Sequence, residues 1–365
     1  QKFTTNAHHW EPSTMKTNYA YGQWPSPISA EMLTQQSAKV SEVRSCDDKI
    51  SWLESRPAEQ GRNALVQLSP DGTRSDALPA PHSIRSRAHE YGGASYSVTA
   101  ERIFCVLDAD QRIYIIDRVS NELTALSPLG PLASEKKYRY ADFSWDETRQ
   151  RLICVREDHS QANHENHIEE RSEIIAIDLK GDITLLISGA DFYSNPRINP
   201  VGDKLSYLCW NHPQMPWDGT ECYCAALNTA GEIIHTQLIA GSKTESVFQP
   251  QWSPTGELFF VSDRTNWWNI YRYSNETIEI VCNMPAEFAT PQWVFGMSTY
   301  GFLNDQEIFC CFSQNGQWQL GLIDIHSKTL HIIPSEFKDI AGIHCNNEQG
   351  YFFAASATKS NTLYS

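Results

Sequence analysis

Residues 195–208 read NPRINPVGDKLSYL, and this stretch belongs to a repeat that decides the fold. Related stretches are ADFSWDETRQRLICV at 141–155 and PQWSPTGELFFV at 250–261. Each places a polar, turn-forming segment before a hydrophobic strand. The equivalent positions Asp146, Pro200 and Pro254 follow one another at intervals of 54 residues. A fixed period of about 50 residues filled by short strands is typical of a β-propeller.

Weaker copies of this unit fill the rest of the chain and predict an all-β protein with about seven four-stranded blades. Val40–Arg44 opens the first copy, and Ala94–Val98 opens the second. The last copy holds three strand-like runs, which are Ile340–His344, Tyr351–Ala355 and Thr362–Tyr364. We therefore expect an incomplete last blade. Either a strand from the N-terminal region or residues beyond Ser365 would complete it, and we favour the second.

The connection at 208–219, LCWNHPQMPWDG, combines two tryptophans with two prolines. Proline fixes φ and removes a backbone donor, so this segment is predicted to be a rigid, irregular loop. It is either a well-packed link between strands or part of a functional surface. Five tryptophans raise the same alternative, since they could line an apolar pocket or pack between blades: Trp210, Trp217, Trp267, Trp268 and Trp293.

The loop resembles the Trp-x-His-Pro-x-Met-Pro-Trp-Asp loop in the N-terminal β-propeller of bacterial prolyl-oligopeptidase-family serine peptidases, in the dipeptidyl aminopeptidase/acylaminoacyl peptidase branch. YGQWPSPI at 21–28 resembles that family's opening segment, and RSRAHEYGG at 85–93 resembles its Glu-Tyr-Gly-Gly motif. WSPTG at 252–256, SDRTNWWN at 262–269 and PQWVFG at 291–296 extend the similarity. It runs from about Tyr19 to Ser365, which implies an N-terminal extension at 1–18 and a propeller domain at 19–365.

In that family an α/β-hydrolase domain with a Ser–Asp–His triad follows the propeller. The sequence contains no Gly-x-Ser-x-Gly, the turn that exposes a nucleophilic serine. Ser97 and Tyr300 stand where the final glycine would be needed. We therefore predict no catalytic residue in this chain and expect the hydrolase domain after Ser365. The resemblance implies a propeller that gates and positions short peptides for that domain, in a parent protein that is a serine peptidase.

Three charged residues are the candidate substrate-binding groups that the resemblance suggests. Propeller carboxylates or arginines can hold an end of the substrate in related peptidases. Arg85 precedes the Glu-Tyr-Gly-Gly motif, Glu90 is its first residue, and Glu287 lies in a second matching segment. By this resemblance Glu90 or Glu287 would bind a peptide N-terminus as ammonium. The alternative is that each is structural.

The amino-acid composition limits the kinds of partner that we expect for this chain. The chain carries 29 basic and 44 acidic residues, a net charge of −15, which argues against nucleic acid. No stretch approaches the roughly 20 apolar residues of a membrane-spanning helix, and Gln1–Thr14 lacks the features of a secretory signal. We expect a cytoplasmic protein whose ten cysteines are reduced. The family resemblance also leaves room for a homo-oligomer.

Two other function classes were weighed. A stand-alone propeller scaffold for protein–protein interaction is the alternative, although the repeated Gly-His and Trp-Asp pairs of such proteins are absent. A metal-dependent propeller enzyme would need inward-facing ligands from several blades. His164 and His167 offer a pair of imidazoles in one polar loop only. We therefore predict no metal and no cofactor.

Overall fold

The computed structural model describes residues 18–30, 32, 38–128, 137–162, 166, 168–346 and 349–365. The chain divides into two compact units, Gln1–Ser37 and Ala38–Ser365. In the first unit, the rings of Tyr19 and Trp24 lie 5.3 Å apart. The first strand of the second unit begins at Lys39. Residues 19–37, which the sequence analysis assigned to the propeller domain, thus precede its first strand.

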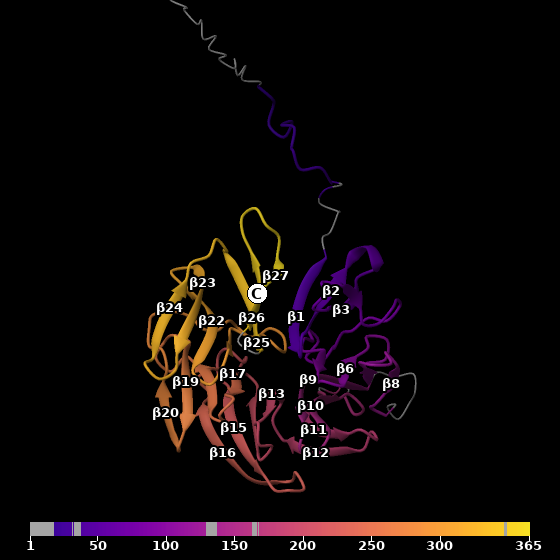
Figure 1. The fold of residues 1–365 in the computed structure, drawn as a ribbon, viewed down its shortest axis with the longest axis vertical. Helices are drawn as coiled ribbons and strands as arrows, with labels where there is room; N and C mark the ends of the chain where they lie inside the picture. The colour runs from indigo at the N-terminus through magenta and orange to yellow at the C-terminus, as the bar shows by residue number, and fades with distance from the viewer. Residues whose placement is uncertain are drawn as a thin grey trace, which may run out of the picture. The chain divides into compact units, whose positions relative to one another are not determined.

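The second unit is a ring of seven antiparallel sheets, which confirms the predicted β-propeller (Figure 1). Six blades have four strands and the last has three, as expected. Blade 1 holds β1 (Lys39–Cys46), β2 (Lys49–Arg56), the 3-10 turn η1 (Pro57–Glu59), β3 (Arg62–Leu68) and β4 (Arg74–Asp76). Blade 2 holds β5 (Tyr96–Val98), β6 (Arg102–Val106), β7 (Ile113–Asp117) and β8 (Leu123–Ala125). Blade 3 holds β9 (Tyr138–Asp146), β10 (Arg151–Asp158), β11 (Arg171–Asp178) and β12 (Ile183–Ser188).

The remaining blades follow the same order from the innermost strand outward. Blade 4 holds β13 (Phe192–Ile198), β14 (Lys204–Trp210), β15 (Glu221–Leu227) and β16 (Ile233–Gly241). Blade 5 holds β17 (Val247–Trp252), β18 (Leu258–Ser262), β19 (Asn269–Ser274) and β20 (Thr277–Ile280). Blade 6 holds β21 (Tyr300–Phe302), β22 (Glu307–Gln314), β23 (Gln317–Asp324) and β24 (Thr329–Ile333). Blade 7 holds β25 (Asp339–Asn346), β26 (Gln349–Ala355) and β27 (Thr362–Tyr364).

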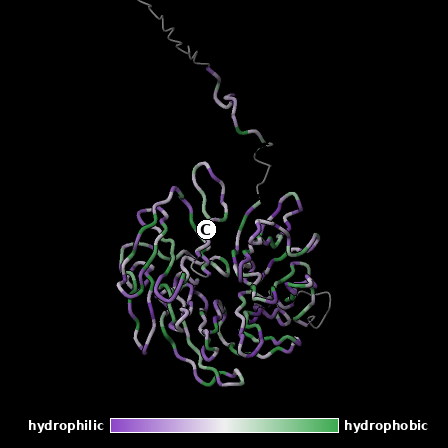
Figure 2. The backbone as a smooth tube through the Cα atoms, in the orientation of Figure 1, coloured by the Kyte–Doolittle hydropathy of each residue, from purple (hydrophilic) through white to green (hydrophobic). Residues whose placement is uncertain are grey.

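The hydrophobic core lies between neighbouring blades. The second strand of each blade is buried on both faces, which explains continuous apolar runs such as Leu152–Val155. One cluster joins Phe104 and Ile113 of blade 2 to Tyr140 and Leu152 of blade 3. Hydrophobic segments accordingly follow the strands around the whole ring (Figure 2). Because each sheet packs on two others, no blade has a complete core of its own.

A two-residue bulge recurs in the innermost strands. The pairing register shifts in β1, β9, β13, β17 and β25. The first bulge residue has positive φ in each case: Glu42, Asp142, Asn195, Gln249 and Gly342. A bulge of this kind redirects its side chain and bends the strand.

Three bulge side chains bridge to the next blade. Each accepts a hydrogen bond from a backbone N–H of the neighbouring innermost segment: Ser95 to Glu42 at 2.8 Å, Asn195 to Asp142 at 2.7 Å and Thr299 to Gln249 at 2.8 Å. Asp142 is buried and also pairs with Arg197 at 2.6 Å. These contacts join blades 1 to 2, 3 to 4 and 5 to 6 around the central channel.

Blades 7 and 1 lie next to each other in the ring (Figure 1), and side chains join them. Tyr351 and Phe353 pack with Trp52 and Val66 in one cluster. His344 of β25 accepts a hydrogen bond from the Ser45 N–H of β1 at 3.0 Å through Nε2. Burial lowers the pKa of His344 to about 3, and the charge of Arg44 acts in the same direction. The neutral imidazole is therefore part of the contact that closes the ring.

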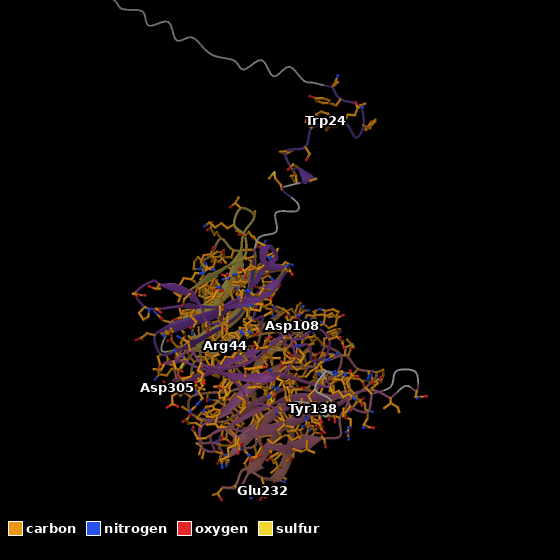
Figure 3. The ribbon with its side chains drawn as sticks, turned by 90° about the vertical axis from the view of Figure 1, so that its right-hand side faces the viewer. Trp24, Arg44, Asp108, Tyr138, Glu232 and Asp305 are labelled. Atoms are coloured by element: carbon orange, nitrogen blue, oxygen red, sulfur yellow. The ribbon has the colours of Figure 1, made fainter. Side chains whose placement is uncertain are left out.

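The strand order defines two faces of the ring. The innermost strands begin at one face, here called the start face, and end in turns at the other. In the edge-on view, Tyr138 at the start of β9 lies toward one side and Asp305 in the β21–β22 turn toward the other (Figure 3). Connections after the second strands, including 211–220 and 263–268, therefore lie at the start face.

Replacing Asp142 tests the bulge contacts. We expect Asp142→Ala to lower the free energy of unfolding by about 3–5 kcal/mol, because it leaves the Arg197 guanidinium and the Asn195 N–H without this acceptor. Urea denaturation measures the loss. The matched control is Asp182→Ala at an exposed position, which should change stability by less than about 0.5 kcal/mol. Equal effects at the two sites would contradict the role given to Asp142.

The seam predicts a pH effect. The folded state keeps His344 neutral down to a pH of about 3, whereas the unfolded chain binds a proton below its ordinary pKa of 6.5. The folded pKa is depressed, so this contribution is present above pH 6.5 and is lost as the pH falls toward 3. We expect His344→Gln to reduce the slope of stability against pH between about 6.5 and 5 by up to about 1.4 kcal/mol per unit. His331→Gln, at an exposed histidine, is the control and should leave the slope unchanged. Identical slopes in wild type and His344→Gln would refute the effect.

Candidate functional site

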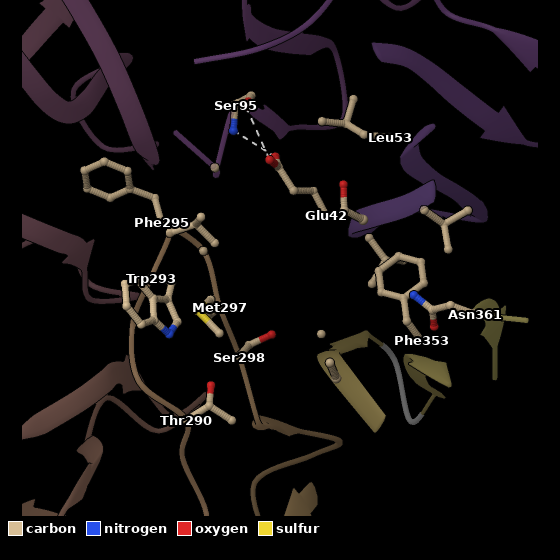
Figure 4. A pocket seen from close by; sticks show the side chains of 18 of the residues that line it. Glu42, Leu53, Ser95, Thr290, Trp293, Phe295, Met297, Ser298, Phe353 and Asn361 are labelled. Carbon is tan, nitrogen blue, oxygen red and sulfur yellow. Dashed lines mark hydrogen bonds between the residues drawn. The ribbon is translucent and has the colours of Figure 1, made fainter. Parts of the chain in front are cut away.

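A cavity of about 650 Å³ opens at the start face (Figure 4). Its walls come from the beginning of β1, the segment 85–95, the segment 290–299 and the beginning of β25. Phe353 of β26 and Leu53 of β2 add apolar surface. The volume lies in the range of small-ligand sites, roughly 300–1,000 Å³. The cavity therefore has room for a small molecule or a short peptide.

The two glycines of the Glu-Tyr-Gly-Gly motif allow the walls of this cavity to approach each other. Gly93 has a φ of 97° and forms a parallel bridge with Phe295. A Cβ on Gly93 would lie 2.3 Å from the Phe295 carbonyl oxygen. A Cβ on Gly92 would lie 2.1 Å from the carbonyl oxygen of Ser86. Positive φ and close backbone approach are the two situations that favour glycine, and both occur at Gly92 and Gly93.

An aromatic group borders the cavity. Tyr91 and Trp293 line it, and their rings are 6.5 Å apart. Trp217, from the Trp-Asp-Gly end of the proline-containing loop, packs on Trp293 at 4.5 Å. Tyr91 and Trp293 remain 68% and 56% exposed. The loop thus supports a partly exposed aromatic surface, while Trp210 is buried within the fold.

The polar side chains of the cavity differ in the hydrogen-bond and ion-pair partners that they have. The Glu42 carboxylate accepts from the Ser95 N–H at 2.8 Å and from the Ser95 hydroxyl at 3.3 Å. Burial raises the pKa of Glu42, and the charge of Arg44 opposes that rise. Arg44 donates through Nη1 to the Val43 carbonyl at 2.8 Å. Within the described ranges, no carboxylate forms an ion pair within 4.0 Å of Arg44 or Arg85.

The three sequence-predicted residues share the start face but have different surroundings. Arg85 is exposed and lines the cavity. Glu90 is exposed and accepts from Arg139 at 2.6 Å. Glu287 accepts from the Trp268 N–H at 3.0 Å, and its backbone pairs with Ser313. The structure thus assigns only Arg85 to the cavity wall, and substrate binding by any of the three stays a prediction.

Sequence reasoning missed Glu42 and Arg44. Their positions could have been suspected, because Glu42 corresponds to Asp142 and Asn195 in the repeat. It also missed a buried carboxylate, Glu157, which accepts from the His89 N–H at 2.6 Å. Burial acts to raise the pKa of Glu157, but the hydrogen bond from His159 and the charge of His89 outweigh it and hold that pKa below its usual value. This network supports the backbone just before Tyr91.

The candidate metal ligands His164 and His167 lie outside the described residues. Within the described part of the chain, no three His, Cys, Asp or Glu side chains are grouped so that they could hold a metal ion. The same residues include no helix of the length and apolarity needed to cross a membrane. All ten cysteines are free thiols.

Comparisons with known proteins give a consistent result. No protein-family model and no curated protein matches the chain. A puromycin-hydrolysing peptidase from Mycobacterium tuberculosis is similar over 95% of this chain, with 30% identity and a TM-score of 0.86. A puromycin hydrolase matches over the same 95% with 28% identity and a TM-score of 0.86. The chain covers 55% of each, so it spans about half the length of these solved structures.

More distant structures share the fold. An acylaminoacyl peptidase from Pyrococcus horikoshii matches 92% of the chain at 13% identity, with a TM-score of 0.64. This chain covers 51% of that peptidase, again about half of its length. The puromycin-hydrolysing peptidases belong to the prolyl-oligopeptidase family and match this chain through their propeller part. The chain is therefore a β-propeller of the prolyl-oligopeptidase family.

Proposed function

We propose that this chain is the non-catalytic propeller domain of a serine peptidase, and that its start face covers the active site of an α/β-hydrolase domain in the same polypeptide. The similarity to puromycin-hydrolysing peptidases that are almost twice as long supports this proposal. The single observation that carries it is the 650 Å³ cavity at the start face, with its exposed aromatic border. A protein that only scaffolds a partner has no need for such a cavity.

The proposed substrates are short peptides. A ring with a 220 Å³ central cavity and a 650 Å³ mouth has no space for a folded domain. The nucleophile, the base and the oxyanion hole would come from the hydrolase domain. The motifs that resemble dipeptidyl aminopeptidases and acylaminoacyl peptidases favour that branch. Ten free cysteines and an acidic surface suit a cytoplasmic protein.

The purified 365-residue chain should not hydrolyse peptides. We expect no release of product from short chromogenic peptides above the rate in buffer, because the sequence lacks a Gly-x-Ser-x-Gly turn. The complete protein, encoded with the sequence that follows, should hydrolyse them and lose activity with a serine-directed inhibitor. Hydrolysis by the 365-residue chain that such an inhibitor abolishes would refute the proposal.

Variants of two of the three candidate residues, Arg85 and Glu287, distinguish substrate binding from structural support in the complete protein. Arg85→Gln should raise KM for short peptides by about tenfold with little change in kcat, because a charged hydrogen bond is lost from the cavity wall. Glu287→Ala should mainly lower stability, since it removes the acceptor for the Trp268 N–H. Lys180→Gln, at an exposed lysine in the turn between β11 and β12 at the opposite face, is the control. An unchanged KM for Arg85→Gln would remove Arg85 from the site.

A further inference from the structure

Two arginine side chains, Arg44 and Arg85, line the wall of the 650 Å³ cavity. Arg44 of β1 is half-buried and lines both this cavity and the 220 Å³ cavity in the central channel. A guanidinium has five N–H donors, and the Arg44 side chain makes one hydrogen bond, to the Val43 carbonyl. The exposed Arg85 adds a second guanidinium to the same wall. Arg44 is labelled in the side view of Figure 3.

The nearby carboxylates are already engaged or exposed. Both oxygens of Glu42 accept hydrogen bonds from Ser95. Asp142, in the channel cavity, accepts from Asn195 and pairs with Arg197. Asp339 also lines the cavity and, like Arg85, is exposed, so solvent screens both charges. The Arg44 guanidinium thus keeps donors for a ligand, and it forms its strongest hydrogen bonds with an acceptor of negative charge.

The rest of the cavity is apolar. Leu53 and Phe353 line one part, and Trp293 and Met297 line another (Figure 4). A planar guanidinium next to apolar walls suits a carboxylate that is attached to a hydrophobic body. An inorganic anion would leave those walls without a contact.

We propose that this cavity binds the free C-terminal carboxylate of a short apolar peptide through Arg44, with Arg85 as a second, more exposed cation. This inference rests on the proposed function, because it assumes that peptides reach the start face. It specifies which end of the peptide the propeller recognises. A peptide without a free carboxylate would lose this contact while keeping the apolar one.

Isothermal titration calorimetry on the purified 365-residue chain tests the proposal. The probes are the tripeptide Ala-Ala-Phe, its C-terminal amide and its N-acetyl form. We expect the free acid and the N-acetyl peptide to bind alike, and the amide at least about tenfold more weakly, as for the loss of one charge-assisted hydrogen bond. Because the hydrolase domain is not needed, this result is independent of the activity that tests the proposed function.

Substitutions at Arg44 and at a control residue test which side chain binds the peptide carboxylate. Arg44→Gln should bind the acid no better than the amide, and Arg44→Lys should restore part of the preference. Lys180→Gln should keep the full preference, since Lys180 is exposed in the turn between β11 and β12 at the opposite face. Near-ultraviolet circular dichroism checks that each variant is folded. If Arg44→Gln does not fold, the acid–amide comparison in wild type and a weakened preference in Arg85→Gln decide.

Three results would overturn the proposal. Equal affinity for acid and amide would show that the carboxylate is not recognised. Loss of binding on N-acetylation instead would assign the cavity to an ammonium group, with Asp339 or Glu42 as its partner. No binding at millimolar peptide would show that the propeller itself has no such site.

Discussion

The hydrogen bond from a bulge side chain to the next blade is the contact on which this ring depends. The bulge forces Glu42, Asp142 and Gln249 into positive φ, and each side chain then reaches a backbone N–H of the neighbouring innermost segment. Apolar packing between blades is non-directional, so it does not by itself fix the angle or height of one blade against another. The directional bonds fix the innermost segments against each other at three junctions, between blades 1 and 2, 3 and 4, and 5 and 6. At the seam, where blade 7 has three strands, His344 and Ser45 take over this role.

The bulge in β1 also shapes the candidate functional site. The bulge in β1 holds the Glu42 carboxylate against Ser95 and thereby leaves Arg44, two residues on, at the boundary of two cavities. Gly92 and Gly93 bring the segment 85–95 against Phe295, and Trp217 supports Trp293 beside it. Elements from blades 1, 6 and 7 therefore meet in one hollow. Under the proposed function, this hollow lies next to the hydrolase domain.

The fold was predictable because its signals are local and repeated. The turn-and-strand unit recurs every 54 residues through blades 3, 4 and 5, and the count of seven blades with an incomplete last one is confirmed. Strand β4 was missed because Arg-Ser-Asp is short and polar. The candidate site was harder to predict, since a sequence does not show which residue a charged side chain pairs with. Glu90 is paired with Arg139, 49 residues away, and Glu287 with a backbone N–H. Arg44 gains its position only when blade 7 closes on blade 1, some 300 residues along the chain.

The most direct test of the account is a structure of the complete protein that contains this chain, determined with a short peptide bound. The account predicts that the additional domain sits on the start face, that Tyr91 and Trp293 become covered, and that its catalytic serine opens toward the 650 Å³ cavity. An additional domain on the opposite face, over the turn that contains Asp305, would contradict the account, because the cavity and its aromatic border would then have no part in peptide hydrolysis.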